Sequence, residues 1–464
     1  MKKGETGTGV IGMTAFPDRG YIEREDGKIL FKHAIPGREV EYRITKRRGD
    51  RGEGMVLSVL KPSPLETEKD PCPHAGDCGG CLYQTLPYRE EAALKERQMK
   101  ELLDEIAGGP FAWEGVTESP ASGGYRAKME FSFGDTVKDG PLALGMHRRG
   151  SHYDIVTADR CRLVHPDFNL ILRATLDYFT EQGVPYFHKL SHEGQLRHLL
   201  VRRGAHSGEI LTDLVHASGL GRELLEGWRD RIAALPLEGT LAGILHTVND
   251  SPADAVIDQG TEVLYGKDWF TETLSGLSFK ITPFSFFQNN SGGAELLYGK
   301  VAEYAGDTAG KTVFDLYSGT GTIAQIVAKT ADRTVGVEIV PEAVRAAEEN
   351  AARNGITNCS FIAGDVLKVL DSLEAVPDVI ILDPPREGVH PKALPKLLKY
   401  GVPRIIYVSC KPTSLRTDIA VLREGGYSLT RAAGVDMFPR TAGCELVCLF
   451  ERERNENDGI QAGR

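Results

Sequence analysis

The sequence predicts a protein of several domains that ends in an α/β domain with a mostly parallel sheet, and three observations lead to this fold class. From about residue 280, apolar runs alternate with helical segments, which is the pattern of parallel βαβ units. The first clear run, at 311–316, leads directly into a Gly-x-Gly turn. Later runs end in acidic residues, at the edge where open sheets of this kind bind ligands.

Length and composition limit the number of domains and the class of protein. A chain of 464 residues is too long for one core, and about three domains are expected. The hydrophobic content of 41% and charged content of 26% are those of a soluble globular protein. No apolar run is long enough to span a membrane, and the first residues lack the apolar core of a signal peptide. We therefore expect a cytoplasmic monomer, in which the eight cysteines are ligands, nucleophiles or core residues rather than disulfides.

Residues 1–61 predict a small β-barrel. Short runs of alternating apolar and polar residues, such as 28–32 and 40–44, are separated by turn signals. This pattern suggests an OB-like barrel, the common RNA-binding version, or a protein-interaction barrel of similar pattern. The net charge of −10 argues mildly against a nucleic-acid partner, but this segment carries 13 Lys and Arg against 9 Asp and Glu. The charge distribution allows an RNA partner without requiring one.

A cysteine-rich loop follows the linker after residue 61. Cys72, Cys78 and Cys81 are interleaved with glycine and proline, and Cys161 is the nearest candidate for a fourth ligand. Four thiolates suit zinc or a [4Fe–4S] cluster, and spacing alone does not separate the two. Because the usual zinc pattern is two close pairs of ligands, we favour the cluster. Other segments of 62–275 predict an α+β domain, with strands near 127–133, 199–203, 209–215 and 243–248 and helices near 88–106, 166–181 and 220–234.

The predicted parallel strands carry polar residues at their ends. Gly319 and Gly321 let the backbone approach a ligand where a helix begins. Glu338, Asp365 and Asp383 end the second, third and fourth strands, and Glu338 is placed to bind a ribose hydroxyl pair. Each acid alone is explained equally well as a helix cap. Together, with Asp-Pro-Pro on the fourth strand, they favour S-adenosylmethionine over a nicotinamide, which would need the full Gly-x-Gly-x-x-Gly.

The fifth run, at 404–409, ends in Cys410, which therefore lies at the ligand-binding edge of the sheet. Lys411 is a neighbouring cation that would favour the thiolate form. The alternative is a buried structural cysteine, which this segment alone favours slightly. The acids at the strand ends and Glu445, elsewhere in the chain, favour the interpretation of Cys410 as a nucleophile.

Taken together, these motifs resemble the RNA uracil-5-methyltransferase family, in the TRAM-domain group that contains an iron–sulfur cluster. The resemblance covers nearly all of the chain. Its motifs are Lys61-Pro62-Ser63-Pro64, the cysteine loop, Ser285-Phe286-Phe287-Gln288-Asn289, Asp383-Pro384-Pro385-Arg386, Ser409-Cys410-Lys411-Pro412, and Asp436-Met437-Phe438-Pro439 followed by Glu445. It implies a TRAM barrel at 1–61, a central α+β domain with the cluster cysteines at 62–275, a Rossmann-like S-adenosylmethionine-dependent methyltransferase domain at 276–452 and a flexible tail at 453–464.

Position by position, the resemblance implies a role for each motif residue. Cys410 would be the nucleophile and Glu445 the base. The cofactor contacts would be Gln288, Tyr317, Thr322, Glu338, Asp365 and Asp383, and the cluster ligands would be Cys72, Cys78, Cys81 and Cys161. The sequence departs from the family at Arg440, where a histidine is usual, and at Thr441-Ala442-Gly443-Cys444, although Glu445 is retained.

The resemblance implies methylation of uracil C5 in RNA, with 23S ribosomal RNA preferred and the T-loop of transfer RNA as the alternative substrate. Two other classes of protein remain open. One is a non-catalytic RNA-binding or ribosome-assembly factor on the same fold, against which the presence of both Cys410 and Glu445 argues. The other is a methyltransferase that acts on nitrogen, which needs no cysteine.

Overall fold

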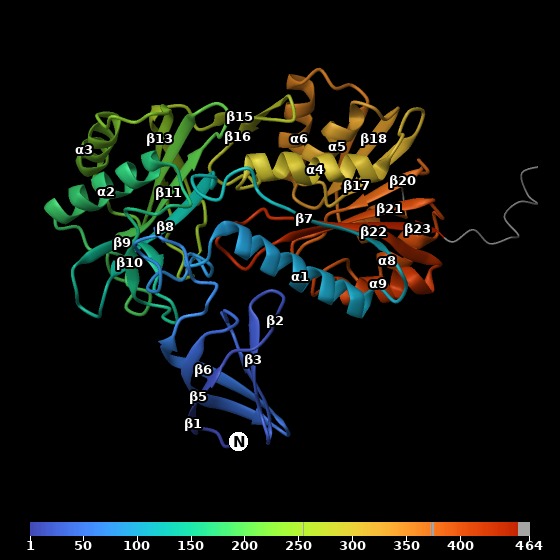
Figure 1. The fold of residues 1–464 in the computed structure, drawn as a ribbon. Helices are drawn as coiled ribbons and strands as arrows, with labels where there is room; N and C mark the ends of the chain where they lie inside the picture. Colours follow the sequence, from blue (N-terminus) through green and yellow to red (C-terminus); the bar gives the residue numbers. More distant parts are fainter. Residues whose placement is uncertain (254, 372, 374, 453–464) are drawn as a thin grey trace, which may run out of the picture. The chain divides into compact units, whose positions relative to one another are not determined.

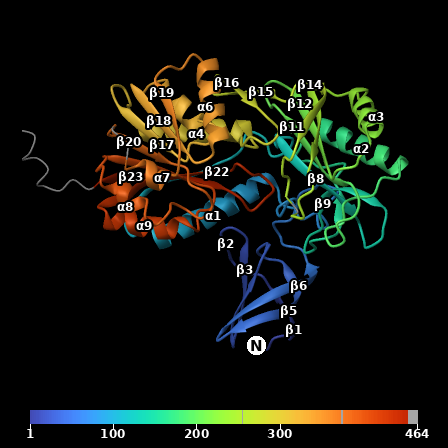
Figure 2. The same cartoon turned by 180° about the vertical axis from the view of Figure 1, so that it is seen from behind.

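The computed structural model describes residues 1–253, 255–371, 373 and 375–452 (Figure 1; Figure 2 shows the reverse view). The predicted flexible tail, 453–464, lies outside the described residues. The chain forms two compact units. The first comprises Met1–Thr67, Leu86–Ser119 and Glu295–Arg464, and the second comprises Glu68–Thr85 and Pro120–Ala294. Among the described helices, none combines the length and apolar character that crossing a bilayer requires.

The first unit begins with a six-stranded sheet, here called the N-terminal sheet, in the order β1-β5-β6-β4-β3-β2. Its strands are β1 (Thr6–Val10), β2 (Thr14–Ala15), β3 (Arg19–Arg24), β4 (Gly27–Phe31), β5 (Glu39–Arg48) and β6 (Arg51–Lys61). Alternation along β3, β4 and β5 buries Ile22, Ile29, Phe31, Tyr42 and Ile44 in a small core. The predicted runs at 28–32 and 40–44 thus fall on strands, whereas the OB-like identity of this segment stays a prediction.

The rest of the first unit is built on an eight-stranded sheet, here called the catalytic sheet, in the order β19-β18-β17-β20-β21-β23-β22-β7. Its strands are β7 (Ala112–Thr117), β17 (Thr312–Leu316), β18 (Arg333–Glu338), β19 (Cys359–Ala363), β20 (Val379–Leu382), β21 (Arg404–Ser409), β22 (Tyr427–Val435) and β23 (Glu445–Arg452). The strands from β17 to β21 are parallel, as the alternating pattern predicts. The strand order changes direction between β17 and β20, which is the usual binding crevice of such sheets.

Helices cover both faces of the catalytic sheet. In Figures 1 and 2, α4 (Ser291–Ala305), α5 (Thr322–Ala328) and α6 (Pro341–Arg353) lie on one face, and α1 (Tyr88–Ile106), α8 (Leu394–Leu398) and α9 (Leu415–Glu424) lie on the other. The short α7 (Val366–Val369) packs into the same core as α1, α8 and α9. The predicted helix at 88–106 is α1, whose inner face is buried and includes the charged residues Glu91 and Lys95, while its outer face is exposed.

The second unit contains a seven-stranded sheet in the order β10-β9-β8-β11-β12-β13-β14 and a separate pair, β15-β16. The strands are β8 (Lys128–Asp135), β9 (Leu142–His147), β10 (Ile155–Thr157), β11 (Leu196–Arg203), β12 (Glu209–His216), β13 (Thr240–Val248), β14 (Thr261–Gly266), β15 (Phe270–Leu274) and β16 (Leu277–Ile281). Two helices, α2 (Pro166–Glu181) and α3 (Arg222–Ala233), pack on this sheet through Phe168, Phe179 and Trp228. The predicted strands and helices of this region are all present, within a few residues of their predicted ends.

Candidate active site

Two neighbouring strands bring Cys410 and Glu445 to the same edge of the catalytic sheet. Cys410 directly follows β21, and Glu445 is the first residue of β23. These strands are antiparallel and pair Ser409 with Leu446, so the next opposed positions are Cys410 and Glu445. The two side chains also interact electrostatically, because the charge of Glu445 raises the pKa of the Cys410 thiol. Residues that lie far from each other in the sequence therefore meet at this edge.

The Cys410 thiol is exposed but lies among acidic groups. Its pKa is raised above the ordinary value, first by partial burial and then by the charges of Glu445 and Asp383. The cation that lowers the thiol pKa is Arg386, rather than the adjacent Lys411 that the sequence suggested. The free protein therefore holds Cys410 mainly as a thiol at neutral pH.

Both acids beside Cys410 have unusual protonation behaviour. Glu445 is only 4% exposed, and its pKa is raised to about 8 by burial and by Asp383, with Arg386 acting in the opposite direction. Asp383 follows β20, and burial raises its pKa to about 7. A carboxylate that titrates near neutral pH is matched to proton transfer at that pH.

The turn after β17 forms the other side of the crevice. Tyr317, Gly319 and Gly321 all adopt positive φ angles, of 67°, 54° and 72°. At Gly321 a Cβ would lie 2.5 Å from the Phe361 ring, so only glycine fits, whereas the space beside Gly319 is open for 4 Å. The Glu338 carboxylate orders this turn by accepting the Gly319 N–H at 3.0 Å. Thr322 begins α5 and is buried.

The remaining predicted cofactor contacts lie in different places. Tyr317 is partly buried, and its pKa is raised by burial and, to a smaller extent, by the charge of Asp365. Asp365 caps α7 by accepting the Leu367 N–H at 2.9 Å, which is the helix-capping role considered above. Gln288 belongs to the second unit, in the loop between β16 and α4. The structure thus brings Tyr317, Glu338, Asp365 and Asp383 to one edge of the catalytic sheet.

One buried acid of this crevice was missed by the sequence analysis. Asp315 lies inside β17, and burial together with the charge of Asp383 raises its pKa to about 8. Its Oδ2 accepts the Ala324 N–H at 2.9 Å, while Oδ1 is buried without a hydrogen-bond partner. The available signal was an aspartate inside an otherwise apolar run, Val313-Phe314-Asp315-Leu316.

The four predicted cluster cysteines all belong to the second unit. The charges of Cys161, Cys78 and Cys72 each act on Cys81, whose pKa is raised to about 12, mainly by burial. N–H groups approach three of the sulfurs. Gly80 donates to Cys78 Sγ and Gln84 Nε2 to Cys81 Sγ, both at 3.4 Å, and the N–H groups of Leu163 and Val164 act on Cys161. Within the described ranges, however, no group of three or more His, Cys, Asp or Glu residues is arranged to hold a metal ion.

The chain is similar to known methyltransferase sequences. Residues 307–433 match the family described as a methyltransferase domain. The chain is 44% identical over 453 residues to a protein of Clostridium tetani named as an uncharacterized RNA methyltransferase, covering 98% of this chain and 99% of that protein. A protein of the same description from Caldanaerobacter subterraneus is 44% identical over 455 residues, covering 97% of this chain and all of that protein.

A solved structure is similar over nearly the same length. The tRNA (uracil-54, C5)-methyltransferase of Pyrococcus abyssi, in complex with S-adenosyl-L-homocysteine, matches with a TM-score of 0.76 and 25% sequence identity. The match covers 96% of this chain and 100% of that one. The likeness therefore extends across both compact units.

Proposed function

This chain belongs to the family of RNA methyltransferases, and we propose that it transfers a methyl group from S-adenosylmethionine to C5 of uracil in RNA. The observation that carries the proposal is the placement of a thiol and a carboxyl group, Cys410 and Glu445, at opposed positions of two paired strands. Methylation on nitrogen requires neither group, because a nitrogen lone pair attacks the methyl group directly. Uracil C5 requires both.

The chemistry proceeds in three steps. The Cys410 thiol first loses its proton to water, and the thiolate adds to C6 of uracil, which forms the S–C6 bond and moves electron density to C5 and O4. C5 then attacks the methyl carbon of the sulfonium, so that the C5–CH3 bond forms, the S–CH3 bond breaks and S-adenosylhomocysteine leaves. Glu445 next removes the C5 proton, the S–C6 bond breaks and the thiolate departs. The product is 5-methyluracil, and the proton rests on Glu445.

The protonation states of the site fit this sequence of events. Buried Glu445, with its pKa raised to about 8, is a stronger base than an ordinary carboxylate once it is ionised. The same burial that makes Glu445 basic disfavours two adjacent charges, which explains why the Cys410 pKa is raised. Arg386 is the nearby cation that offsets this effect. We infer that Asp383 also contacts the uracil edge.

The residues of the β17 turn fit S-adenosylmethionine, which supplies the methyl group on its sulfonium. The open space beside Gly319 lets a ligand approach the backbone, and the Glu338 carboxylate lies next to it. A buried Oδ1 of Asp315 and a buried Ser318 hydroxyl have no hydrogen-bond partner within the described residues. We propose that Tyr317, Thr322, Glu338, Asp365 and Asp383 hold the cofactor, together with Gln288.

We also propose that Cys72, Cys78, Cys81 and Cys161 hold a [4Fe–4S] cluster. The donor set suits it, because N–H groups directed at Cys78, Cys81 and Cys161 stabilise thiolate sulfurs. Bound there, the cluster would link the loop that contains Cys72, Cys78 and Cys81 to the distant Cys161. The role assigned to the cluster is structural.

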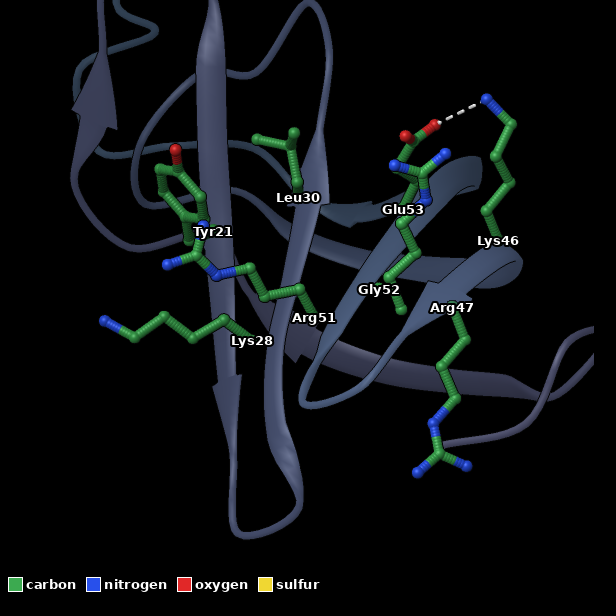
Figure 3. Close-up of a pocket in the computed structure, with 9 residues that line it drawn as sticks. Tyr21, Lys28, Leu30, Lys46, Arg47, Arg51, Gly52 and Glu53 are labelled. Atoms are coloured by element: carbon green, nitrogen blue, oxygen red, sulfur yellow. Dashed lines mark hydrogen bonds and ion pairs between the residues drawn. The ribbon is translucent and has the colours of Figure 1, made fainter.

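RNA binding is assigned to the N-terminal sheet. A hollow of about 470 Å³ lies between β3, β4, β5 and β6 (Figure 3). It is lined by Tyr21, Lys28, Leu30, Lys46, Arg47, Arg48, Arg51, Gly52 and Glu53. Lys46 is paired with Glu53 at 3.1 Å, whereas Arg48 and Arg51 make no ion pair with any residue that the structure describes. Basic side chains around one aromatic ring suit phosphate contacts and base stacking, and predict binding that weakens with salt.

The decisive experiment maps 5-methyluridine in total RNA from cells with and without this protein. The purified protein is then given labelled S-adenosylmethionine with 23S ribosomal RNA or transfer RNA, with Cys410→Ala as the control. We expect one of the two RNAs, with 23S RNA preferred, to gain 5-methyluridine. A methylated nitrogen, or label transfer that persists with Cys410→Ala, would overturn the proposal. No transfer to any RNA would favour the non-catalytic binding factor.

A further inference from the structure

A buried cluster of charges lies between α1 and the end of β22. Lys95 Nζ donates to Glu91 Oε1 at 2.7 Å and to Asp436 Oδ1 at 2.8 Å, and all three side chains are 0% exposed. Glu91 and Lys95 are one helical turn apart on the inner face of α1. Asp436 directly follows the last residue of β22. The cluster therefore joins an early helix to a segment more than 300 residues later.

Further contacts of this cluster reach one loop, residues 436–444, here called the 436–444 loop. Lys95 Nζ also donates to the Phe438 carbonyl, at 3.3 Å. Glu91 Oε1 accepts the Arg440 N–H at 2.6 Å, and the Arg440 guanidinium donates to the Leu86 carbonyl at 2.6 Å. Three positions of the loop are thus fixed to the first half of α1.

This loop ends at the proposed base. Val435 at its start pairs with Glu445 at its end, across β22 and β23. Cys444 closes the loop by donating its Sγ hydrogen to the Val435 carbonyl at 3.4 Å. The 436–444 loop therefore runs from its contacts with α1 directly into the first residue of β23. Arg440 has a positive φ of 70° and contacts Glu91 of α1 and Leu86, which lies just before α1.

If this buried charge cluster served stability alone, apolar side chains would hold the loop with a smaller desolvation cost. Burying three charges carries a desolvation cost that apolar side chains of the same volume avoid. What charged groups add is geometric specificity, because each bond fixes a direction as well as a distance. On the exposed side of the same helix, Lys100 and Asp104 form an ion pair of equal spacing, at 2.6 Å, with both side chains partly exposed.

We infer that Lys95 is a positioning residue for Glu445. Through Asp436 and Phe438 it sets the 436–444 loop, and through that loop the place of the carboxylate that removes the C5 proton. The inference rests on the proposed function. It assigns Lys95 to one step, proton removal and release of the enzyme, and leaves thiolate addition and methyl transfer to Cys410 and the cofactor.

The test uses the full-length protein, a uridine-containing RNA substrate and labelled S-adenosylmethionine. With Lys95→Met we expect turnover to fall at least about tenfold, while methyl transfer in a single turnover stays within about threefold of the unaltered protein. A methylated protein–RNA adduct then accumulates on a denaturing gel, as it does with Glu445→Gln. Lys100→Met, on the same helix, is the matched control and leaves turnover and adduct level unchanged.

A second variant is needed because Lys95→Met leaves two buried carboxylates, Glu91 and Asp436, without their cation and could prevent folding. In Glu91→Gln/Lys95→Met/Asp436→Asn the buried charges are gone and the volumes are kept, and the same adduct is expected. Unchanged turnover in either folded variant overturns the inference, as does a parallel loss of turnover and of single-turnover methyl transfer. Failure of both variants to fold also overturns it, because Lys95 would then serve the whole unit. If the unaltered protein forms neither 5-methyluridine nor an adduct with 5-fluorouridine RNA, the proposed function itself has failed.

Discussion

The chain places cysteines in two contrasting environments. Cys410 follows a strand of the catalytic sheet, where partial burial and neighbouring carboxyl groups raise the pKa of its thiol. Cys72, Cys78, Cys81 and Cys161 lie in loops of the second unit, where N–H groups approach three of the four sulfurs. Acids beside a sulfur suit a transient nucleophile, whereas N–H donors suit a permanently bound thiolate. The neighbours of a cysteine therefore say more about its role than its exposure does.

The largest effect is expected when the proposed nucleophile, Cys410, is replaced. Cys410→Ala removes the only group proposed to activate C5, and we expect methyl transfer to fall by about 10³-fold or more. Affinity for S-adenosylmethionine is expected to stay within a few-fold, because Cys410 is not among the proposed cofactor contacts. Labelled methyl transfer and calorimetric titration measure the two quantities. Cys359→Ala, at the start of β19, is a matched control that keeps activity.

Removing the base affects a later step. Glu445→Gln keeps the shape of the side chain but cannot accept the C5 proton, so turnover is expected to fall by roughly 10²–10⁴-fold. Because addition and methyl transfer still occur, a covalent protein–RNA adduct should appear as a shifted band on a denaturing gel. If no adduct forms although the variant binds RNA and cofactor, another group is the base.

The cluster cysteines are expected to act through folding rather than chemistry. Cys81→Ser should lower the iron content and the melting temperature, where a loss of about 2 kcal/mol corresponds to roughly 4–8 °C. Iron analysis and calorimetry measure these effects. The rate at which iodoacetamide alkylates Cys410 is expected to stay unchanged in the same variant. Full iron content in Cys81→Ser would contradict the assignment of this ligand.

The smallest expected effect concerns the titration of Cys410 itself. The negative charge of Glu445 raises the thiol pKa and Arg386 lowers it. Alkylation of Cys410 should therefore begin at lower pH in Glu445→Gln and at higher pH in Arg386→Met. For Glu445→Gln, the difference in alkylation rate from the unaltered protein should widen above pH of about 8, where Glu445 is ionised in the unaltered protein. Identical profiles in all three proteins would mean that these charges do not reach the thiol.

Local patterns in the sequence predicted much of this molecule. The runs at 311–316, 379–383 and 404–409 became parallel strands, because continuous apolar runs that alternate with helices have few other folds. The antiparallel strand β23 between β21 and β22 was not predicted, because strand order depends on pairing between distant residues. Glu445 was found only by resemblance for the same reason. The burial of Lys95 was not predicted, because its partner Asp436 lies 341 residues away and no local pattern shows the pair.

The order of the strands also has a consequence for synthesis of the chain. β7 must wait for β22, its parallel partner at the sheet edge, which is made more than 300 residues later. The strand that carries Glu445, β23, is made after β21 and β22 and enters between them. Until then the nascent chain exposes an open edge of β21 directly beside Cys410. A chain that stops before β23 therefore leaves this edge unpaired, and Cys410 gains Glu445 as a neighbour only after β23 has been made.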